Sequence, residues 1–415
     1  MTRKLNVFLY GKKTGVLSED AMGHLNFEYD SMKSYPLSVR MPVKPEIYGP
    51  TYTEPFFNNL TPEGDAIGLI ASKFHISEEN TFSILNKIGG DCAGAVSLYP
   101  NDIEYAIDNP LKEIDERSIA KIIDKLPTNP LLTGMANAPR LSLAGAQSKF
   151  AVYKSKDGKY YRSDEDHPTT HIIKIANKYY EDLLENELFC MTLAQTIFKD
   201  AIDVNMNIAD GRKYLEIQRY DRQNTRGKIT RIHQEDFCQV LGYLNSKKYQ
   251  SDGGPKIPQV YGAILEYSSQ RVADAYKFIQ MLIFNYLVGN TDAHAKNFSF
   301  LHIDKANGVI LSPVYDIVSI DIYPQSIVSH EIAMTINGKG TFESIKARDW
   351  IALFEQLRMN PTTTMQEMRQ VFGRIVQDSE QLAERLNAAP LTKSDIYKKI
   401  LQNIKTRYNA LFVTE

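Results

Sequence analysis

Asn290-Thr291-Asp292-Ala293-His294-Ala295-Lys296-Asn297 is the stretch on which the fold prediction rests, together with Tyr315-Asp316 further along. Within it, Asp292 precedes Asn297 by five residues. Five residues carry a loop through one tight reversal, so the carboxylate can face one reactant while the carboxamide faces another. A divalent ion such as Mg2+ takes several hard oxygen ligands, which carboxylates and amides supply. The spacing therefore predicts a loop that carries a proton acceptor, Asp292, and a metal ligand, Asn297.

The residues between Asn297 and Asp316 predict a β-hairpin. Two short apolar segments, 298–303 and 309–311, have the composition of strands and flank a turn at 304–308 that ends in Asn-Gly. Because a hairpin brings its outer ends together, we expect Asn297 to lie beside Asp316. The two side chains would then offer Mg2+ an amide oxygen and a carboxylate.

The same spacing of aspartate and asparagine occurs in the catalytic loop of protein kinases. There the aspartate accepts the proton of the substrate hydroxyl and the asparagine binds a metal ion. The set Asp292, Asn297 and Asp316 therefore favours phosphoryl transfer. The alternative is that Asp292 caps a loop and Asp316 lies in an ordinary turn after a Ser-Pro pair. No second cluster of His or Cys accompanies His294, so its expected role is a hydrogen bond that orders the loop rather than a transition-metal site.

The composition is that of an ordinary globular protein. The chain has 415 residues, 43% hydrophobic and 24% charged, which predicts two or three domains with a sizeable core. The formal net charge of -2 gives no overall electrostatic case for nucleic-acid binding. The three cysteines are far apart in sequence and are expected to be reduced thiols. Charged residues interrupt the N-terminal segment and no run of about 18 apolar residues occurs, so we expect a cytoplasmic protein without a membrane segment.

The first hundred residues predict a β-rich unit. Strand-like segments at 5–10, 16–17, 25–29 and 93–99 are separated by breaks rich in glycine. The stretch 42–62, dense in Pro, Tyr, Thr and Asn, is expected to run as a loop over the surface before a helix at about 66–74. No charged cluster suited to chemistry occurs in this unit, which we interpret as a docking or bracing module.

A loop of small residues precedes a predicted strand at 150–153. Its centre, Ala144-Gly145-Ala146, would let backbone N–H groups approach a phosphate, and Lys149 could add positive charge. The loop matches neither a Walker A motif nor the glycine-rich loop of protein kinases, so a tight β-turn is the alternative. Upstream, apolar residues recur at helical spacing from Ile119 to Leu126, and prolines end that predicted helix at a domain boundary.

Lys174 and Glu187 form a second feature suited to nucleotide binding. Lys174 ends a predicted strand, and Glu187 lies beside the apolar stripe of the helix that follows. In protein kinases a strand lysine reaches the α- and β-phosphates and is held by a glutamate of the next helix. The alternative is that both are solvated surface charges.

The remaining patterns predict one hinge and several helices. The segment 214–222 predicts a strand that runs into a charged turn, where backbone groups could bind the adenine edge; a plain strand with a polar exit fits equally well. Apolar residues from Ala275 to Leu287 recur at helical spacing and lead into the loop at Asn290. From Trp350 onward the pattern is mainly helical, and the loop 252–255 has no assigned role.

In this order and approximate spacing, the segments resemble the HipA toxin kinases of bacterial type II toxin–antitoxin modules. The resemblance is most specific in the Ala-Gly-Ala-Gln loop at 144–147 and the Thr-Asp-x-His-Ala-Lys-Asn loop at 291–297. It implies an α+β fold, a eukaryotic-like protein kinase variant with two lobes, an extra β-rich N-terminal subdomain and a mostly helical C-terminal lobe. We expect the subdomain at 1–105, the N-lobe with nucleotide loop and hinge at 106–236, and the helical C-lobe with catalytic loop and metal site at 237–415.

The resemblance also implies ATP-dependent serine/threonine phosphorylation and a role for each matching residue. Asp292 would be the catalytic base, Asn297 and Asp316 the Mg2+ ligands, and Glu187 the ion-pair partner of Lys174. Ser142 matches the serine that the family autophosphorylates, which would switch the kinase off; the alternative is a turn residue whose hydroxyl caps the loop. The residues expected to contact ATP are Ala144, Gly145, Ala146, Gln147, Ser148, Lys149, Lys174, Gln218, Arg219, Tyr220, His294, Ala295, Lys296, Asn297, Tyr315 and Asp316.

Partners follow from the same resemblance. Family members act on a protein substrate, typically a translation component such as an aminoacyl-tRNA synthetase, and are restrained by a HipB-like helix-turn-helix antitoxin. Where some relatives carry a basic run, this chain has a single lysine within 337–340, so DNA association is expected mainly through the antitoxin. Two alternatives are a small-molecule kinase, which needs the same base and metal ligands, and a non-catalytic pseudokinase. The joint presence of Lys174, Asp292, Asn297 and Asp316 argues against the pseudokinase.

Overall fold

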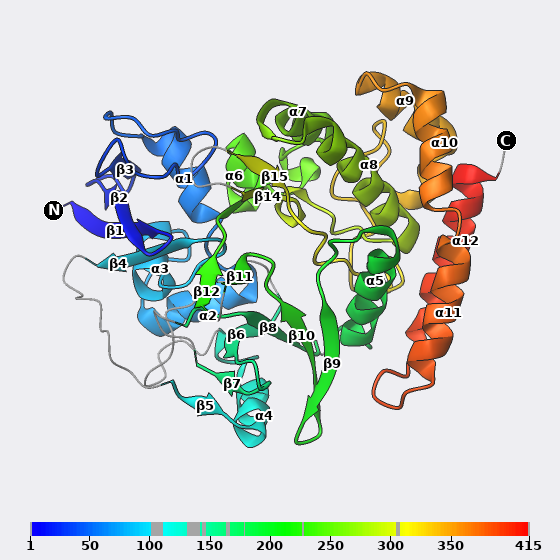
Figure 1. Cartoon of the computed structure of the whole chain (residues 1–415), viewed down its shortest axis with the longest axis horizontal. Coiled ribbons are helices and arrows are strands. Elements are labelled where there is room, and N and C mark those ends of the chain that lie inside the picture. Colours follow the sequence, from blue (N-terminus) through cyan, green and yellow to red (C-terminus); the bar gives the residue numbers. More distant parts are fainter. Residues whose placement is uncertain are drawn as a thin grey trace. The chain divides into compact units, whose positions relative to one another are not determined.

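The computed structural model describes residues 2–100, 111–130, 142, 147–162, 167–177, 179–225, 228–303 and 308–413 (Figure 1). The chain forms two compact units. The first unit combines Met1–Ile175, Ile208–Ser246 and Ser299–Ile310, and the second combines Ala176–Asn207, Lys247–Phe298 and Leu311–Glu415. Each unit is therefore assembled from segments that are separate in sequence, and the three-part division at 105 and 236 stays a prediction.

An antiparallel sheet opens the first unit. Its strand order is β3-β2-β1-β4, with β1 at Arg3–Leu9, β2 at Lys12–Glu19, β3 at Leu25–Tyr29 and β4 at Val96–Pro100. Alternate residues of β1, namely Leu5, Val7 and Leu9, are fully buried, as expected for a strand with one face on a core. The sheet predicted from the first hundred residues is confirmed.

Three helices accompany this sheet: α1 at Pro50–Asn58, α2 at Asp65–Phe74 and α3 at Thr81–Ile88. The helix predicted at 66–74 is confirmed, but the surface loop predicted for 42–62 is wrong because α1 lies within it. Proline is tolerated in the first turn of a helix, where its missing N–H has no partner to lose. Phe57 of α1 is fully buried and its ring lies 6.0 Å from that of Phe27, so packing outweighs the loop-like composition.

A six-stranded sheet forms the rest of the first unit's core. In the order β5-β7-β6-β8-β10-β9, its strands are Glu113–Ile114, Tyr160–Tyr161, Lys149–Lys154, His171–Ile175, Arg212–Gln218 and Val204–Ala209. Helix α4, Glu116–Lys125, begins at Asp115, whose carboxylate accepts the Ser118 N–H at 2.8 Å. The isoleucines of α4 share a buried cluster with Phe150 and Ile173 of this sheet. The helix and the strands predicted around Lys149 and Lys174 are thus confirmed.

Smaller elements complete the first unit. They are β11 at Arg222–Thr225, β12 at Lys228–Arg231, β13 at Gln234–Asp236, α6 at Phe237–Leu241 and β14 at Ser299–His302, with β15 at Val309–Leu311 reaching into the second unit. Strand β14 lies between β13 and β15, and the Ile303 N–H donates to the Gly308 carbonyl at 2.9 Å. The predicted hairpin is confirmed, and its tip, 304–307, lies outside the described residues.

The second unit is mainly helical. Its helices are α5 at Leu183–Ile197, α7 at Ile257–Tyr267, α8 at Arg271–Val288, α9 at Ala347–Gln356, α10 at Pro361–Val371, α11 at Ile375–Asn387 and α12 at Ile396–Phe412. Helix α8 carries the apolar stripe predicted from Ala275 to Leu287 and is buried over most of its length. Among the described helices, none is long and apolar enough to cross a membrane. The three cysteines are free and buried.

Candidate active site

The loop that carries Asp292 begins where α8 ends. Gly289 follows the helix with a φ of 83°, a left-handed conformation that glycine adopts readily. Asn290 then anchors the turn, because its side chain donates to the Asn285 carboxamide at 2.7 Å and accepts the Asp292 N–H at 3.1 Å. A short 3₁₀ helix, η4 at Ala295–Asn297, closes the loop. These contacts all lie within the second unit and make the loop a tight, internally bonded reversal, as the spacing predicted.

The Asp292 carboxylate is accessible and hydrogen-bonded. Its side chain is 47% exposed, and the Tyr249 hydroxyl donates a hydrogen bond to its Oδ1. His294 lies on the same side, with Nε2 3.9 Å from that oxygen and its ring edge-to-face with Tyr249. The Tyr249 hydroxyl thus bonds one oxygen of the carboxylate, Oδ1. Because the carboxylate is half-exposed, it can also accept a proton from a second hydroxyl.

Tyr249 is a residue of this site that the sequence did not single out. It stands at the start of the loop 249–255, where the Gly254 N–H donates back to the Tyr249 carbonyl at 2.9 Å. A Cβ at Gly254 would collide with the backbone carbonyls of Lys247 and Tyr249, so only glycine fits there. The Gly-Gly pair, whose role was unassigned, therefore shapes the turn that presents Tyr249. Two adjacent glycines next to an aromatic residue were the signal available in the sequence.

Asn297 and Asp316 have the donor atoms of a Mg2+ site. The Asn297 amide nitrogen donates to the Asp292 carbonyl at 2.8 Å, which directs its amide oxygen away from that bond. Asp316 follows Tyr315, whose hydroxyl donates to the Lys296 carbonyl at 2.9 Å and so ties this segment to the loop. Among the described residues no group of three or more His, Cys, Asp or Glu could hold a metal ion. Oxygen ligands from one amide and one carboxylate suit Mg2+, which keeps its other positions for water and phosphates.

Asp316 adopts a left-handed backbone conformation, with a φ of 58°. Such a conformation is uncommon for a residue with a side chain and persists only where the surroundings hold it. Downstream, the Asn186 side chain on α5 donates to the Ser319 carbonyl and accepts the Ser319 N–H, both at 2.9 Å. The segment after Asp316 is thereby fastened to the helix that carries Glu187.

Lys174 and Glu187 are both buried, with 5% and 0% of the residue exposed. The alternative that they are solvated surface charges is therefore wrong. Lys174 lies on β8 in the first unit, directly opposite Lys149 of β6 in the strand register. Residues at paired positions project on the same face of a sheet. Two lysines therefore concentrate positive charge on one face of this sheet, as a phosphate-binding surface requires.

The nucleotide loop is described only in part. Ala144, Gly145 and Ala146 lie outside the described residues. Gln147 donates from its side chain to the Ile175 carbonyl at 3.3 Å, which joins the end of the loop to the strand of Lys174.

Ser142 is completely buried. Its hydroxyl donates to the Leu60 carbonyl at 2.5 Å, and its N–H donates to the Asp91 carbonyl at 3.0 Å. The Ser142 hydroxyl must leave this position before it can accept a phosphoryl group. The hydroxyl thus has a structural partner, which is a carbonyl 82 residues away rather than a group of its own loop.

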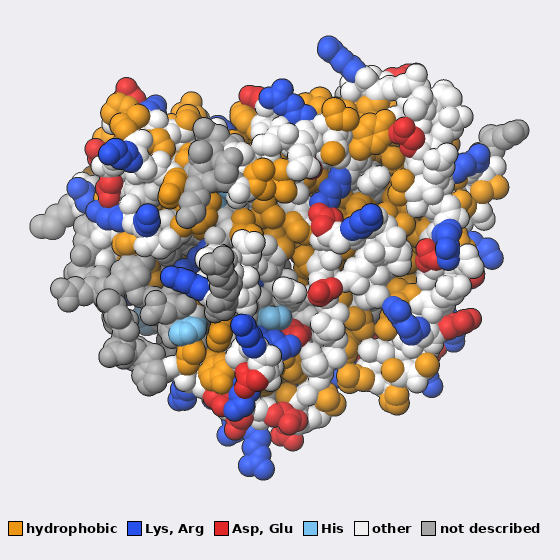
Figure 2. Space-filling view, in the orientation of Figure 1, with side chains coloured by type: hydrophobic (Ala, Val, Ile, Leu, Met, Phe, Trp, Pro, Cys, Tyr) orange, Lys and Arg blue, Asp and Glu red, His pale blue; other side chains and the backbone are white. Residues whose placement is uncertain are grey.

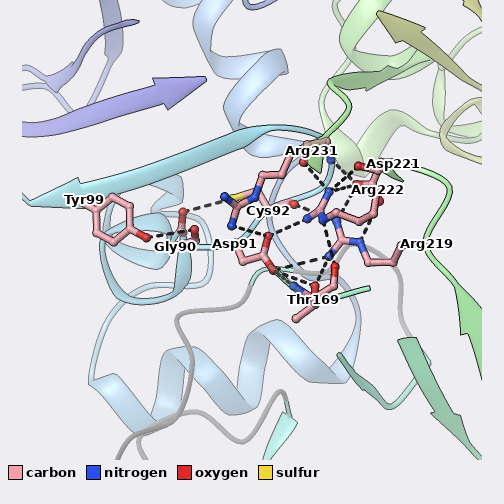
Figure 3. A network of polar contacts seen from close by, with 11 residues as sticks. Gly90, Asp91, Cys92, Tyr99, Thr169, Arg219, Asp221, Arg222 and Arg231 are labelled. Carbon is pink, nitrogen blue, oxygen red and sulfur yellow. Dashed lines mark hydrogen bonds and ion pairs between the residues drawn. The ribbon is translucent and has the colours of Figure 1, made fainter. Parts of the chain in front are cut away.

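The predicted hinge, Gln218–Tyr220, joins a buried ionic network (Figure 3). The Arg219 guanidinium bonds both oxygens of Asp221, at 2.9 and 2.6 Å, and reaches the Thr169 hydroxyl at 2.8 Å. The Arg219 N–H is also engaged, since it donates to the Thr170 carbonyl at 2.9 Å. Both the guanidinium and the backbone N–H of Arg219 therefore already form hydrogen bonds within the protein.

Asp91 is the second acidic centre of this network. Its carboxylate accepts from Arg222 at 2.8 Å and from the Thr169 hydroxyl at 2.8 Å, and Arg231 lies 3.4 Å away. Burial alone would raise the pKa of Asp91, but the guanidinium groups of Arg222, Arg231 and Arg219 lower it well below its ordinary value. Burial, with the charge of Arg219 next, lowers the pKa of Arg222 to about 10, so both groups are charged at neutral pH.

Charges of both signs are interspersed on the visible surface rather than gathered into one patch (Figure 2). This distribution agrees with the formal net charge of -2. A broad basic face of the kind that binds DNA is not seen in this view.

Comparisons with known proteins cover nearly the whole chain. A putative kinase of Sinorhizobium fredii is 35% identical over 92% of this chain and 93% of its own length. The serine/threonine-protein kinase toxin HipA of Shewanella oneidensis is 29% identical over 78% of this chain and 75% of its own length. These relatives define the class: the chain is an enzyme of the kinase type.

Two family models match in addition. Residues 5–99 match the HipA N-terminal domain and residues 141–382 match the HipA-like C-terminal domain. The chain belongs to the HipA family. A solved structure of Shewanella oneidensis HipA with HipB and operator DNA superposes with a TM-score of 0.85 at 25% identity, over 99% of this chain and 100% of that one. The recognition of the family from the two motif loops, and the mixed α and β kinase-like fold, are confirmed.

Proposed function

We propose that the chain is a toxin kinase that transfers the γ-phosphate of ATP to a serine or threonine hydroxyl of a protein substrate. The observation that carries this proposal is the half-exposed Asp292 carboxylate with a hydroxyl group already donating to it. A base must lie within hydrogen-bond reach of the proton it accepts. Asp292 would accept the proton of the substrate hydroxyl as that oxygen attacks the γ-phosphorus and ADP leaves.

The other side chains of the site would bind and orient the reactants. Lys174 and Lys149 would bind the phosphates, with Glu187 holding Lys174, and the backbone around Gln218 would take the adenine edge. Asn297 and Asp316 would hold Mg2+, which when bound neutralises charge on the phosphates. An amide oxygen and a carboxylate are ligand types that Mg2+ accepts.

Activity tests follow from these roles. Asp292→Asn is expected to bind ATP but lose most transfer, because the base is lost while the metal ligands remain. Asp316→Ala is expected to lose Mg2+-dependent ATP binding instead. Labelled ATP with purified protein and cell lysate measures transfer, and isothermal calorimetry with and without Mg2+ measures binding. Full activity in both variants would contradict the assignment.

The substrate and partners are part of the proposal. We expect a translation component such as an aminoacyl-tRNA synthetase as substrate, and restraint by a HipB-like antitoxin, with DNA bound through that partner. The Shewanella oneidensis HipA structure contains HipB and operator DNA, which supports a complex of the same kind. Phosphoproteomics of cells expressing wild type or Asp292→Asn would identify the substrate. Labelling of a metabolite and of no protein would favour the small-molecule alternative.

Autophosphorylation at Ser142 would switch the kinase off. A phosphoryl group adds about -1.5 to -2 charges at pH 7. The buried position against the Leu60 carbonyl cannot take that group, so the modified loop would leave its site. ATP affinity of protein phosphorylated to completion, measured beside Ser142→Ala, tests this mechanism. An unchanged affinity after stoichiometric modification would overturn it.

A further inference from the structure

Helix α12 carries two side chains, those of Arg407 and Asn403, that bond groups around the loop of Asp292 within the second unit. Arg407 forms an ion pair with Asp321, and these side chains are 9% and 4% exposed. The Arg407 guanidinium also donates to the Leu287 carbonyl at 3.4 Å, in the last turn of α8. One turn earlier on α12, Asn403 donates to the other oxygen of Asp321 at 3.1 Å. The Asp321 carboxylate is therefore held from α12 at both oxygens.

Asp321 is in turn bonded to the start of the catalytic loop. The N–H groups of Ile320 and Asp321 both donate to the Gly289 carbonyl, at 2.8 and 3.2 Å. A Cβ at Gly289 would collide with the Asp321 carboxylate, so the absence of a side chain there permits the close approach. Gly289 is the residue directly before Asn290. The segment that follows Asp316 is thus joined to the start of the loop that carries Asp292.

The same segment is fastened a second time from α5. Asn186 bonds both the N–H and the carbonyl of Ser319, three residues after Asp316. Asp316 itself has a left-handed backbone that needs such support. The contacts at Ser319 and Asp321 fix where the chain leaves Asp316, and the contact at Gly289 fixes that segment against the catalytic loop.

We propose that Arg407 is a positioning residue: through Asp321 it sets the placement of the Asp316 segment against the catalytic loop. This inference rests on the proposed function, in which Asp316 binds Mg2+ and Asp292 is the base. Helix α12 lies beyond residues 141–382, the part matched by the family's C-terminal domain model. Arg407 touches neither proposed ligand, so its effect on the reaction passes through Asp321 and the backbone it holds.

The test uses the full chain and three variants. Arg407→Met removes the charge and keeps the bulk, while Arg407→Lys keeps the charge. Ser394→Ala is the matched control, because it removes a part-buried hydrogen bond just before the same helix, and that bond is made to Asp182 rather than to Asp321. For each variant the transfer rate is measured as a function of Mg2+ at saturating ATP, and folding is checked by thermal melting.

Arg407→Met is expected to raise the half-saturating Mg2+ concentration roughly tenfold, since the loss of a group that orients metal ligands commonly lowers metal affinity at least that much. Arg407→Lys is expected to restore part of the difference, and Ser394→Ala to leave the Mg2+ requirement at the wild-type value. If Arg407→Met does not fold, Asn403→Ala keeps the ion pair and is expected to shift the Mg2+ requirement in the same direction by a smaller factor.

Two results separate this inference from the proposed function. If Asp292→Asn abolishes transfer while Arg407→Met and Asn403→Ala keep the wild-type Mg2+ requirement, the positioning role is wrong and the kinase assignment stands. A fall in melting temperature with an unchanged Mg2+ requirement would also overturn it, because Arg407 would then be only structural. If Asp292→Asn retains full transfer, the proposed function itself fails.

Discussion

The buried ionic network around Asp91 gives the sharpest stability prediction. In Asp91→Asn the side chain keeps its shape and loses its charge. Asp91 and Asp221 face three guanidinium groups, those of Arg219, Arg222 and Arg231, so the substitution leaves a single carboxylate among them. Removing one partner of a buried ion pair costs about 3–5 kcal/mol because the remaining charge is uncompensated. Asp91→Asn is expected to lower the free energy of unfolding by about this amount.

The assay is urea unfolding of the full chain at pH 7, followed by circular dichroism. At that pH the contribution of Asp91 is present in full, because its folded pKa is lowered and its stabilising effect is lost only as the pH falls below the ordinary value for an aspartate. Asp124→Asn is the matched control. It breaks a pair of hydrogen bonds with Arg212 in the same unit, but that carboxylate is 52% exposed, and such an exposed pair contributes little to stability.

Two outcomes would refute the reasoning. One is a cost for Asp91→Asn that does not exceed that of Asp124→Asn. The other concerns the double variant Asp91→Asn with Arg222→Gln. Its cost in unfolding free energy should differ from the sum of the two single costs, because contacting buried partners should show a coupling energy of about 0.5–3 kcal/mol. Full additivity would mean that the hydrogen bonds of the network, rather than its charges, stabilise the fold.

Three further predictions concern the site and the core. Tyr249→Phe is expected to lower the transfer rate roughly ten- to hundredfold with the ATP affinity unchanged, because a hydrogen bond to a charged group contributes about 1.5–3 kcal/mol. An unchanged rate would show that the hydroxyl does not orient Asp292. Gly254→Ala is expected to reduce the transfer rate at least as much, because it would displace Tyr249. Gly262→Ala is the control, because a Cβ there meets open space on α7, and it should leave the rate unchanged. Equal effects of the two substitutions would contradict the argument that only glycine fits at position 254. Burial, with the neighbouring His302 next, lowers the pKa of His233 to about 3 from 6.5, so the unfolded chain takes up a proton below pH 6.5 that the folded chain does not. Between pH 6 and pH 5 this costs about 1 kcal/mol of stability, and urea unfolding should find the fall in stability over that range smaller by about this amount in His233→Gln than in the wild type.

The local patterns of the sequence determined much of the fold. Three local patterns depend only on neighbours within a few residues: the alternation in β1, the apolar stripe of α8 and the apolar segments on either side of the Asn-Gly pair. The strands and the helix they predict formed where expected. The five-residue spacing from Asp292 to Asn297 likewise predicted a closed loop, and the two motif loops identified the family. Prediction failed at α1, whose proline-rich composition indicates a loop; its helix depends on burying Phe57 against Phe27, a contact between separate elements.

Only the tertiary structure decided which charged and polar residues are buried and which contact the loop of Asp292. Lysine and glutamate are residue types usually found on the surface. The burial of Lys174 and Glu187 depends on what the fold packs around them. Tyr249 reaches Asp292 across 43 residues, and Arg407 reaches Asp321 across 86. No periodicity links such positions, because a side chain's partner at that separation is set by how helices and loops pack. The sequence therefore determined the elements and the catalytic loop, while packing determined the residues that hold that loop in place.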